Sequence, residues 1–246
     1  MKHFYATILF ITLLLPIVER VNAQERLIPD RPGFSTGTFT VPKGVIYIET
    51  GYQFSYRNSS ANRKSEFPEI NLRTGITSKS EVFVSWDGVE VDHYHSGTAA
   101  PLPSIGGKLN LLDGGRIDLT LLAVWNHSNI DGEYRIDPMA GVMWEAELNE
   151  KTGYYGGFQI ESEPENNGRM WVPAFASGLE FELSEKLTTV FEGYTIYESS
   201  DRSFQLGLEA GLLFYPAPSV QLDLFGGFGL TDGISHYLGA GVSFRI

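Results

Sequence analysis

The chain has 246 residues, no cysteine and a formal net charge of −12 at pH 7. Its length suits one all-β barrel folded as a single unit. The missing cysteines exclude disulfides, thiolate metal sites and an N-terminal cysteine for lipid attachment. The negative charge argues against a nucleic-acid partner, because phosphates require a basic surface.

Residues 1–23 predict a cleavable signal peptide. Lys2 precedes an apolar stretch from about Phe4 to Val18, and the small-residue site Val21-Asn22-Ala23 follows. An uncleaved helical anchor is the alternative, but the apolar run is short and contains Pro16. No later stretch reaches the roughly 18 apolar residues of a membrane helix, so a mature form in a membrane must cross it with strands.

Residues 24–44 form a polar segment with many prolines and glycines, which is too polar to face lipid. We expect this segment at the periplasmic mouth of a barrel or in its lumen. Asp30 and Arg31 are its candidate plug residues, because Arg31 could pair with carboxylates inside the barrel.

From residue 45 to residue 246 about twelve segments of roughly ten residues alternate apolar and polar side chains, as β-strands do. In "VIYIETGYQFSYR" Ile46, Ile48 and Tyr52 share one face, whereas Glu49 and Gly51 share the other. The same division recurs in "SFQLGLEAGLLFY" and in the final "HYLGAGVSFRI". The pattern predicts an all-β protein with a single antiparallel transmembrane β-barrel of about 12 strands, in which the last strand pairs with the first and leaves no edge.

The connections between these segments alternate in kind. Short turns are predicted at "TSKS", "LDGGR", "NEKTG", "LSEKL" and "YPAPS", and mostly longer, more polar connections at "RNSSANRKSE", "DHYHSGTAAPLPS", "HSNIDGEY", "SEPENNGR", "SSDRS" and "TDGIS". Bacterial outer-membrane barrels have short periplasmic turns, longer outer loops and an even strand number. A soluble secreted β-sandwich is the alternative fold, although Greek-key connections give no reason for alternating lengths.

The predicted inner face carries more acids than bases, and charges on membrane strands require water or a partner. The candidate lumen or channel-lining residues are Glu49, Glu69, Arg73, Glu81, Lys108, Arg116, Asp118, Glu145, Glu147, Glu180, Glu192, Glu209, Asp223 and Arg245. They predict either a closed network of ion pairs or an acidic channel wall that disfavours anions. Many inward-facing glycines leave room for a cavity or a plug.

No catalytic residue, metal site or cofactor is predicted. His93 and His95 form a His-x-His pair without an evident third ligand. His127 and His236 have neighbouring serines, but no Gly-x-Ser-x-Gly motif or ordered triad spacing supports a lipid-acting enzyme.

Four short motifs precede or begin the first strand: Asp30-Arg31-Pro32-Gly33, Ser35-Thr36-Gly37-Thr38, Val41-Pro42-Lys43-Gly44 and Glu49-Thr50-Gly51-Tyr52. Together with the final "LTDGISHYLGAGVSFRI", they resemble the family of outer-membrane proteins labelled for the meta-pathway of phenol degradation, often called simply "transporter". The resemblance implies a single barrel with a transport role and offers no catalytic residues.

The leading hypothesis is therefore a passive outer-membrane channel or transporter for small, aromatic or otherwise hydrophobic molecules. The expected partners are outer-membrane lipids, the outer-membrane assembly machinery that reads the last strand, and an unidentified small solute. A closed structural or surface-interaction barrel is the main alternative.

Overall fold

The computed structural model of the chain describes residues 26–57, 63–94, 97–130, 133–165, 168–199 and 202–246, and the expected signal peptide lies outside them. No helix among the described residues is long and apolar enough to cross a membrane. The strands are β1 (Ile46–Tyr56), β2 (Arg63–Gly75), β3 (Ser80–Trp86), β4 (Val89–Asp92), β5 (Gly97–Ala99), β6 (Ser104–Leu112), β7 (Asp118–Ile130), β8 (Glu133–Asn149), β9 (Thr152–Glu165), β10 (Gly168–Ser184), β11 (Leu187–Glu198), β12 (Ser203–Ala217), β13 (Val220–Gly229) and β14 (His236–Arg245).

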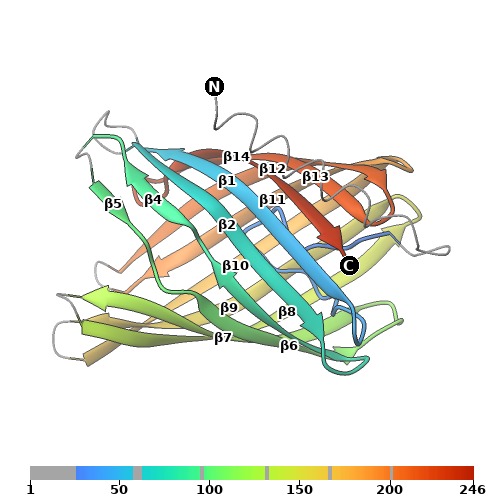
Figure 1. The fold of residues 1–246 in the computed structure, drawn as a ribbon, viewed down its shortest axis with the longest axis horizontal. Helices are drawn as coiled ribbons and strands as arrows, with labels where there is room; N and C mark the ends of the chain where they lie inside the picture. Colours follow the sequence, from blue (N-terminus) through green and yellow to red (C-terminus); the bar gives the residue numbers. More distant parts are fainter. Residues whose placement is uncertain (1–25, 58–62, 95–96, 131–132, 166–167, 200–201) are drawn as a thin grey trace, which may run out of the picture.

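These strands close into an antiparallel barrel (Figure 1). In the described part of the chain twelve strands form the ring, namely β1 to β3 and β6 to β14. The short β4 pairs with one end of β2, and β5 pairs with β4. β1 pairs with β2 on one side and with β14 on the other, from Tyr47 opposite Arg245 to Tyr56 opposite His236. The predicted closure of the first strand on the last is thus confirmed.

The strand residues alternate as the sequence predicted, and the apolar side chains face outward, as expected of a transmembrane barrel. In β12, Leu206, Leu208 and Leu212 are exposed, whereas Gly207 and Glu209 are buried inside the barrel. Such an arrangement would be unfavourable in water, because each exposed leucine leaves apolar area hydrated. It is the expected arrangement when the outer face contacts hydrocarbon. The apolar outer face and the closed ring together make this a bacterial outer-membrane barrel.

The five predicted short turns connect β2 to β3, β6 to β7, β8 to β9, β10 to β11 and β12 to β13, and they define the short-turn end of the barrel. At the opposite loop end, two of the predicted long connections are mostly strand. β7 continues to Ile130 and β8 begins at Glu133, while β9 continues to Glu165 and β10 begins at Gly168. Their polar residues therefore extend the barrel wall, because backbone pairing continues where the side chains no longer need to be apolar.

The wall is irregular near Phe67 and Pro68 of β2. Gly51 of β1 lies opposite Glu69, but Gln53, two residues further along β1, lies opposite Glu66. β2 thus uses three residues where β1 uses two, which is a β-bulge, one of the positions where a strand accepts proline. Because of the extra residue, Glu66 and Glu69 both line the lumen although they are an odd number apart.

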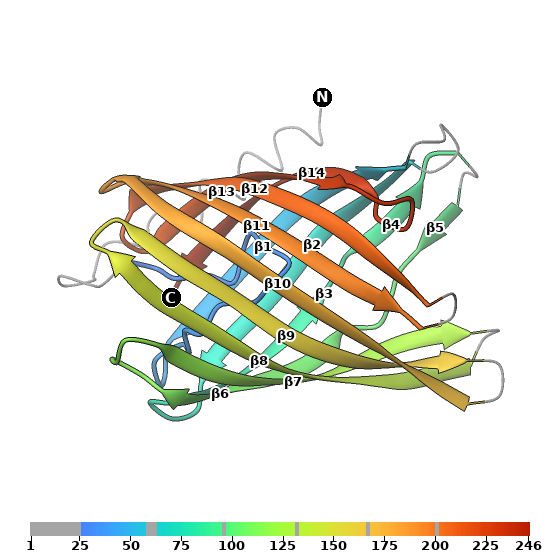
Figure 2. The same cartoon turned by 180° about the vertical axis from the view of Figure 1, so that it is seen from behind.

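Residues 26–44, hereafter the N-terminal segment, lie inside the ring of strands (Figure 2). The segment begins at the short-turn end, where the Leu27 N–H donates to the carbonyl of Pro218, and returns to that end, where Lys43 forms a parallel bridge with Gly75. Leu27 and Val41 are completely buried and pack with Tyr47 in a small apolar cluster. The cluster holds both ends of the segment against the wall.

Candidate functional site: the inner segment and the lumen cavity

A buried ion cluster joins the N-terminal segment to the barrel wall. Arg73 contacts Glu49 at 3.0 Å, Glu81 at 2.9 Å and Asp30 at 3.2 Å. Lys108 Nζ lies 2.5 Å from Asp30 and also donates to the carbonyl of Gly37. The wall side chains of this cluster are fully buried, namely those of Glu49, Arg73, Glu81 and Lys108. Charges this deeply buried are tolerated only when they are paired and hydrogen-bonded. Removing Asp30 would take away the closest carboxylate of Lys108 and leave it 3.8 Å from Glu81, which already pairs with Arg73.

Carboxylates of the wall also bind the backbone of the segment. Glu81 accepts the N–H of Val41 at 2.6 Å, and Glu145 accepts the N–H of Thr38 at 2.8 Å. Glu192 accepts the N–H of Phe34 at 2.7 Å, together with the N–H and hydroxyl of Ser35. An irregular backbone inside a barrel needs such partners for its donors. Several acids of the inner face therefore serve as hydrogen-bond acceptors for this segment.

Arg31 donates fewer hydrogen bonds than Arg73 does. Its Nη1 donates to Glu69 at 2.6 Å, and its Nη2 lies 3.5 Å from Asp223. Within the described part of the chain, Nε and Nη2 have no hydrogen-bond acceptor. Its guanidinium also lies over the ring of Phe225, 5.3 Å from the centroid. Burial opposes the charge, yet Asp223 and Glu69 outweigh it and raise the pKa of Arg31 above its ordinary value. Arg31 therefore stays charged while it contacts two walls of the lumen.

Several inward glycines accommodate the segment. A Cβ on Gly51 would lie 2.3 Å from Arg31 Nη2, and a Cβ on Gly75 would lie 2.1 Å from the carbonyl oxygen of Val41. Other inward glycines are covered by an aromatic ring of a neighbouring strand. These pairs are Gly106 with Phe83, Gly178 with Tyr155, Gly207 with Tyr194, Gly227 with Tyr237 and Gly239 with Phe225. The glycines therefore create less open space than their number in the sequence suggests.

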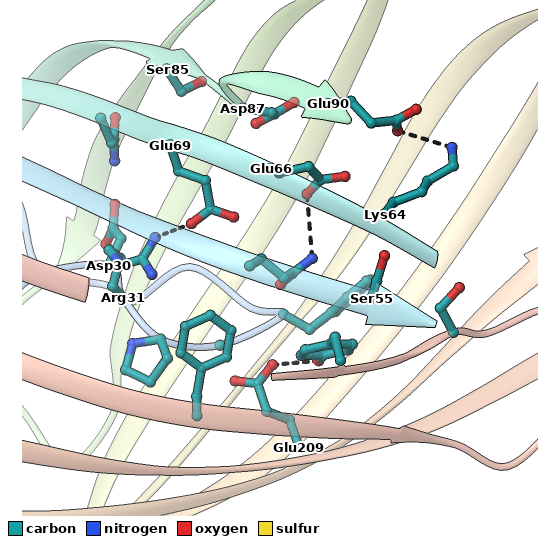
Figure 3. Close-up of a pocket in the computed structure, with 18 of the residues that line it drawn as sticks. Asp30, Arg31, Ser55, Lys64, Glu66, Glu69, Ser85, Asp87, Glu90 and Glu209 are labelled. Carbon is teal, nitrogen blue, oxygen red and sulfur yellow. Dashed lines mark hydrogen bonds and ion pairs between the residues drawn. The ribbon is translucent and has the colours of Figure 1, made fainter. Parts of the chain in front are cut away.

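A cavity of about 800 Å³ remains above the segment, on the side of the loop end. Figure 3 shows Glu66, Glu69, Asp87 and Glu90 on one side of the cavity and Glu209 on the opposite side. Asp30 and Arg31 lie at the left of this view. Its lining residues are Asp30 to Phe34, Glu49, Gln53, Ser55, Arg57, Lys64, Glu66, Glu69 to Asn71, Ser85 to Asp87, Glu90, Tyr194, Ile196, Glu209, Phe225, Gly233 to Ser235 and Tyr237. The cavity thus combines acidic and aromatic walls.

The predicted lumen residues fall into three groups. Glu49, Arg73, Glu81, Lys108, Glu192, Glu209 and Asp223 are buried inside the barrel, Glu69, Asp118, Glu145, Glu180 and Arg245 are half-buried on the same face, and Arg116 and Glu147 are exposed at the short-turn end. Arg116 lies in the turn before β7, so it is not part of the wall. The inner side chains of Glu66, Glu90 and Tyr194 are missing from the predicted set. Glu66 was placed in the predicted loop "RNSSANRKSE", whereas β2 already begins at Arg63 and its bulge turns Glu66 towards the lumen.

Two of the histidines that the structure describes make hydrogen bonds with neighbouring residues. His93 shares a hydrogen bond of 2.7 Å with Ser65, and Nδ1 of His236 accepts the N–H of Gly229 at 3.2 Å. His95 lies outside the described residues. Within the described ranges no group of three His, Asp or Glu side chains could hold a metal ion.

The geometry defines an outer-membrane barrel with a segment folded into its lumen. An outer membrane channel from Pseudomonas putida F1 has the same fold, with a TM-score of 0.63 at 12% identity over 93% of this chain and 100% of that chain. The NanC porin matches with a TM-score of 0.59 at 9% identity, covering 82% of this chain and all of its own. The KdgM porin, in a complex with disordered oligogalacturonate, matches with 0.57 at 6% identity over 80% and 98%.

At these identities the likeness establishes the fold. No protein-family model matches the sequence, and no curated protein matches it. The chain therefore shares its architecture with outer-membrane porins and channels.

Proposed function

We propose that the protein is a passive outer-membrane channel for small solutes, closed towards the periplasm by its N-terminal segment. The observation that carries this proposal is the cavity of about 800 Å³, whose floor is formed by residues 30–34 of that segment. Ser55, Arg57 and Ser235 line the same cavity near the loop end, where a solute would enter. The shared fold with outer-membrane channels supports this role.

The solute is proposed to be small and partly aromatic or otherwise apolar. Phe34, Trp86, Tyr194, Phe225 and Tyr237 line the cavity, and aromatic side chains of this kind bind apolar surfaces and rings. The family resemblance, with its label for phenol degradation, agrees with a solute of this class. The wall carboxylates would disfavour anions in the open state.

Conductance of the protein in planar bilayers tests the proposal. The intact chain should pass little current, because the buried ion cluster holds the segment in the lumen. Deletion of residues 27–40 should open the barrel and give steady, cation-selective steps in a salt gradient. Folding of both forms is checked by their resistance to unfolding in detergent. If a correctly folded deletion variant has the same conductance as the intact chain, the segment does not close the channel.

A closed structural barrel is the second candidate, and the buried cluster of Asp30, Arg73 and Lys108 favours it. It predicts no pore in the intact chain and no change in solute uptake when the protein is absent from cells. Swelling assays with vesicles containing the intact protein separate the two candidates. A channel whose segment opens only occasionally passes little current but still admits neutral solutes slowly, whereas a closed structural barrel admits none.

A further inference from the structure

The charges around the lumen cavity are not balanced. Glu69 pairs with Arg31 at 2.6 Å, and Glu90 pairs with Lys64 at 2.9 Å. In contrast, Glu66, Asp87 and Glu209 form no ion pair with any described residue, although all three line the cavity. Glu66 also faces the like charges of Glu69, Asp87 and Glu90. An acidic cavity of this kind attracts cations and raises their local concentration.

Glu209 has a free oxygen in a largely enclosed position. Glu209 is only 6% exposed. Its Oε2 accepts the hydroxyl of Tyr237, whereas Oε1 has no donor among the residues that the structure describes. A buried carboxylate oxygen without a donor is unfavourable and is a ready acceptor for a ligand. Figure 3 shows this carboxylate across the cavity from Glu66 and Glu69.

Aromatic rings surround this acceptor. Tyr237 donates to Glu209 directly, the ring of Phe225 lies 6.2 Å from that of Tyr237, and Phe34 stacks on Tyr194 with centroids 4.4 Å apart. Rings beside a carboxylate favour a cation, because the faces of the rings attract positive charge. Phe225 already has the guanidinium of Arg31 over its ring.

The ligand chemistry follows from these two observations. A single metal ion does not fit, because no three carboxylates or imidazoles of the described residues converge on one point. A volume of about 800 Å³ instead suits an organic molecule. We propose that the cavity binds a small organic ammonium ion with an apolar or aromatic body. The ammonium group donates to Oε1 of Glu209, and the body lies against Tyr194 and Tyr237.

This assignment rests on the proposed channel function and names its solute class. Glu66 and Asp87 lie on the opposite wall and steer the cation towards Glu209, while Arg31 prevents it from pairing with Glu69. A neutral aromatic of the same shape finds the same rings but leaves Oε1 of Glu209 without a donor.

Calorimetric titration of the full protein, purified from outer membranes in detergent, tests the site. Benzylamine, which is protonated at pH 7, should bind at least about tenfold more tightly than benzyl alcohol, since one charge-assisted hydrogen bond is lost in the alcohol. E209Q keeps an acceptor for Tyr237 and should weaken benzylamine binding at least about tenfold. The control E147Q, at an exposed position, should bind both probes as the unchanged protein does.

Equal affinities for the amine and the alcohol would overturn the proposal, and so would a folded E209Q that binds benzylamine normally. If E209Q does not fold, Tyr194→Leu replaces it, and unchanged benzylamine binding then has the same meaning. Calcium binding that E209Q abolishes would refute the organic ligand in favour of a metal. The titration needs no conduction, so binding by a protein that never conducts would refute the channel and retain the site.

Discussion

Gly51 of β1 and Gly241 of β14 lie directly opposite each other in the seam that closes the barrel, and the guanidinium of Arg31 occupies the space above both. A Cβ on Gly241 would lie 2.6 Å from Arg31 Nε, and one on Gly51 would lie 2.3 Å from Arg31 Nη2. Both distances are well below van der Waals contact. The seam and the N-terminal segment therefore depend on the same pair of glycines.

The first prediction concerns Gly51→Ala. The added methyl group must displace Arg31 from Glu69 and Asp223, which should destabilise the barrel by about 1–3 kcal/mol, as overpacking usually does. Urea unfolding in lipid vesicles measures this change. In an Arg31→Ala background the same substitution should cost less than half as much, because the clashing group is absent.

Gly168→Ala is the matched control, since a Cβ there has no atom of another described residue within 4 Å. It should leave the unfolding midpoint unchanged. If Gly51→Ala lowers the free energy of unfolding equally with and without Arg31, the glycine is required by the pairing of β1 with β14 and not by contact with Arg31.

The second prediction concerns the buried ion cluster. Arg73→Met leaves Glu49 and Glu81 fully buried, with Lys108 as the one nearby cation among the described residues. Unfolding should therefore become easier by about 3–5 kcal/mol. Lys64→Met is the comparison. Its pair with Glu90 is partly exposed, with side chains 40% and 30% accessible, and such pairs contribute up to about 1 kcal/mol. Similar costs for the two substitutions would contradict the assignment of Arg73 as the central cation.

The outer features of this barrel were predictable from the sequence because they are local. A two-residue period in "VIYIETGYQFSYR" suffices to assign Ile46 to lipid and Glu49 to the lumen, and short turns show themselves by composition. The bulge at Phe67 and Pro68 was not predictable in this way. Glu66 ends the polar stretch "RNSSANRKSE", which the sequence assigned to a loop, and a two-residue period counted back from Glu69 would have pointed Glu66 outward.

The contacts between the N-terminal segment and the barrel wall could not be predicted from the sequence either. Glu192 accepts hydrogen bonds from Phe34 and Ser35, residues more than 150 positions away, and no periodic pattern links them. The segment has neither helical nor strand periodicity, because its backbone donors are satisfied by wall carboxylates and not by a neighbouring strand. The sequence could suggest that Arg31 meets a carboxylate, but not which one.

The third prediction follows from this long-range contact. Glu192→Gln removes the charge and one of the two acceptor oxygens that hold Phe34 and Ser35, so the N-terminal segment should leave the lumen more often. The chain has no native cysteine, so Thr38→Cys, at a position only 3% exposed, gives a clean reporter. Maleimide should label this introduced cysteine at least about tenfold faster in the Glu192→Gln background.

Glu182→Gln is the control for that measurement. Glu182 is half-exposed and approaches Arg26 at 3.6 Å, near the start of the segment. Its substitution should leave the labelling rate of the introduced cysteine within about twofold, because a weak exposed pair contributes little. Equal acceleration by both variants would show that Glu192 has no special role in retaining the segment.

The fourth prediction concerns the lipid-facing surface. Leu224 lies in the middle of β13, opposite Leu212 and Ala240 of the neighbouring strands, and is 60% exposed on the outer face. Leu224→Arg should destabilise the barrel in lipid vesicles by about 2–4 kcal/mol, because it places a charge near the centre of the hydrocarbon. Leu230→Arg, just beyond the loop end of β13 and similarly exposed, should cost at most about 1 kcal/mol. If the two substitutions cost the same, the apolar band does not lie across the bilayer in the orientation that the strands define.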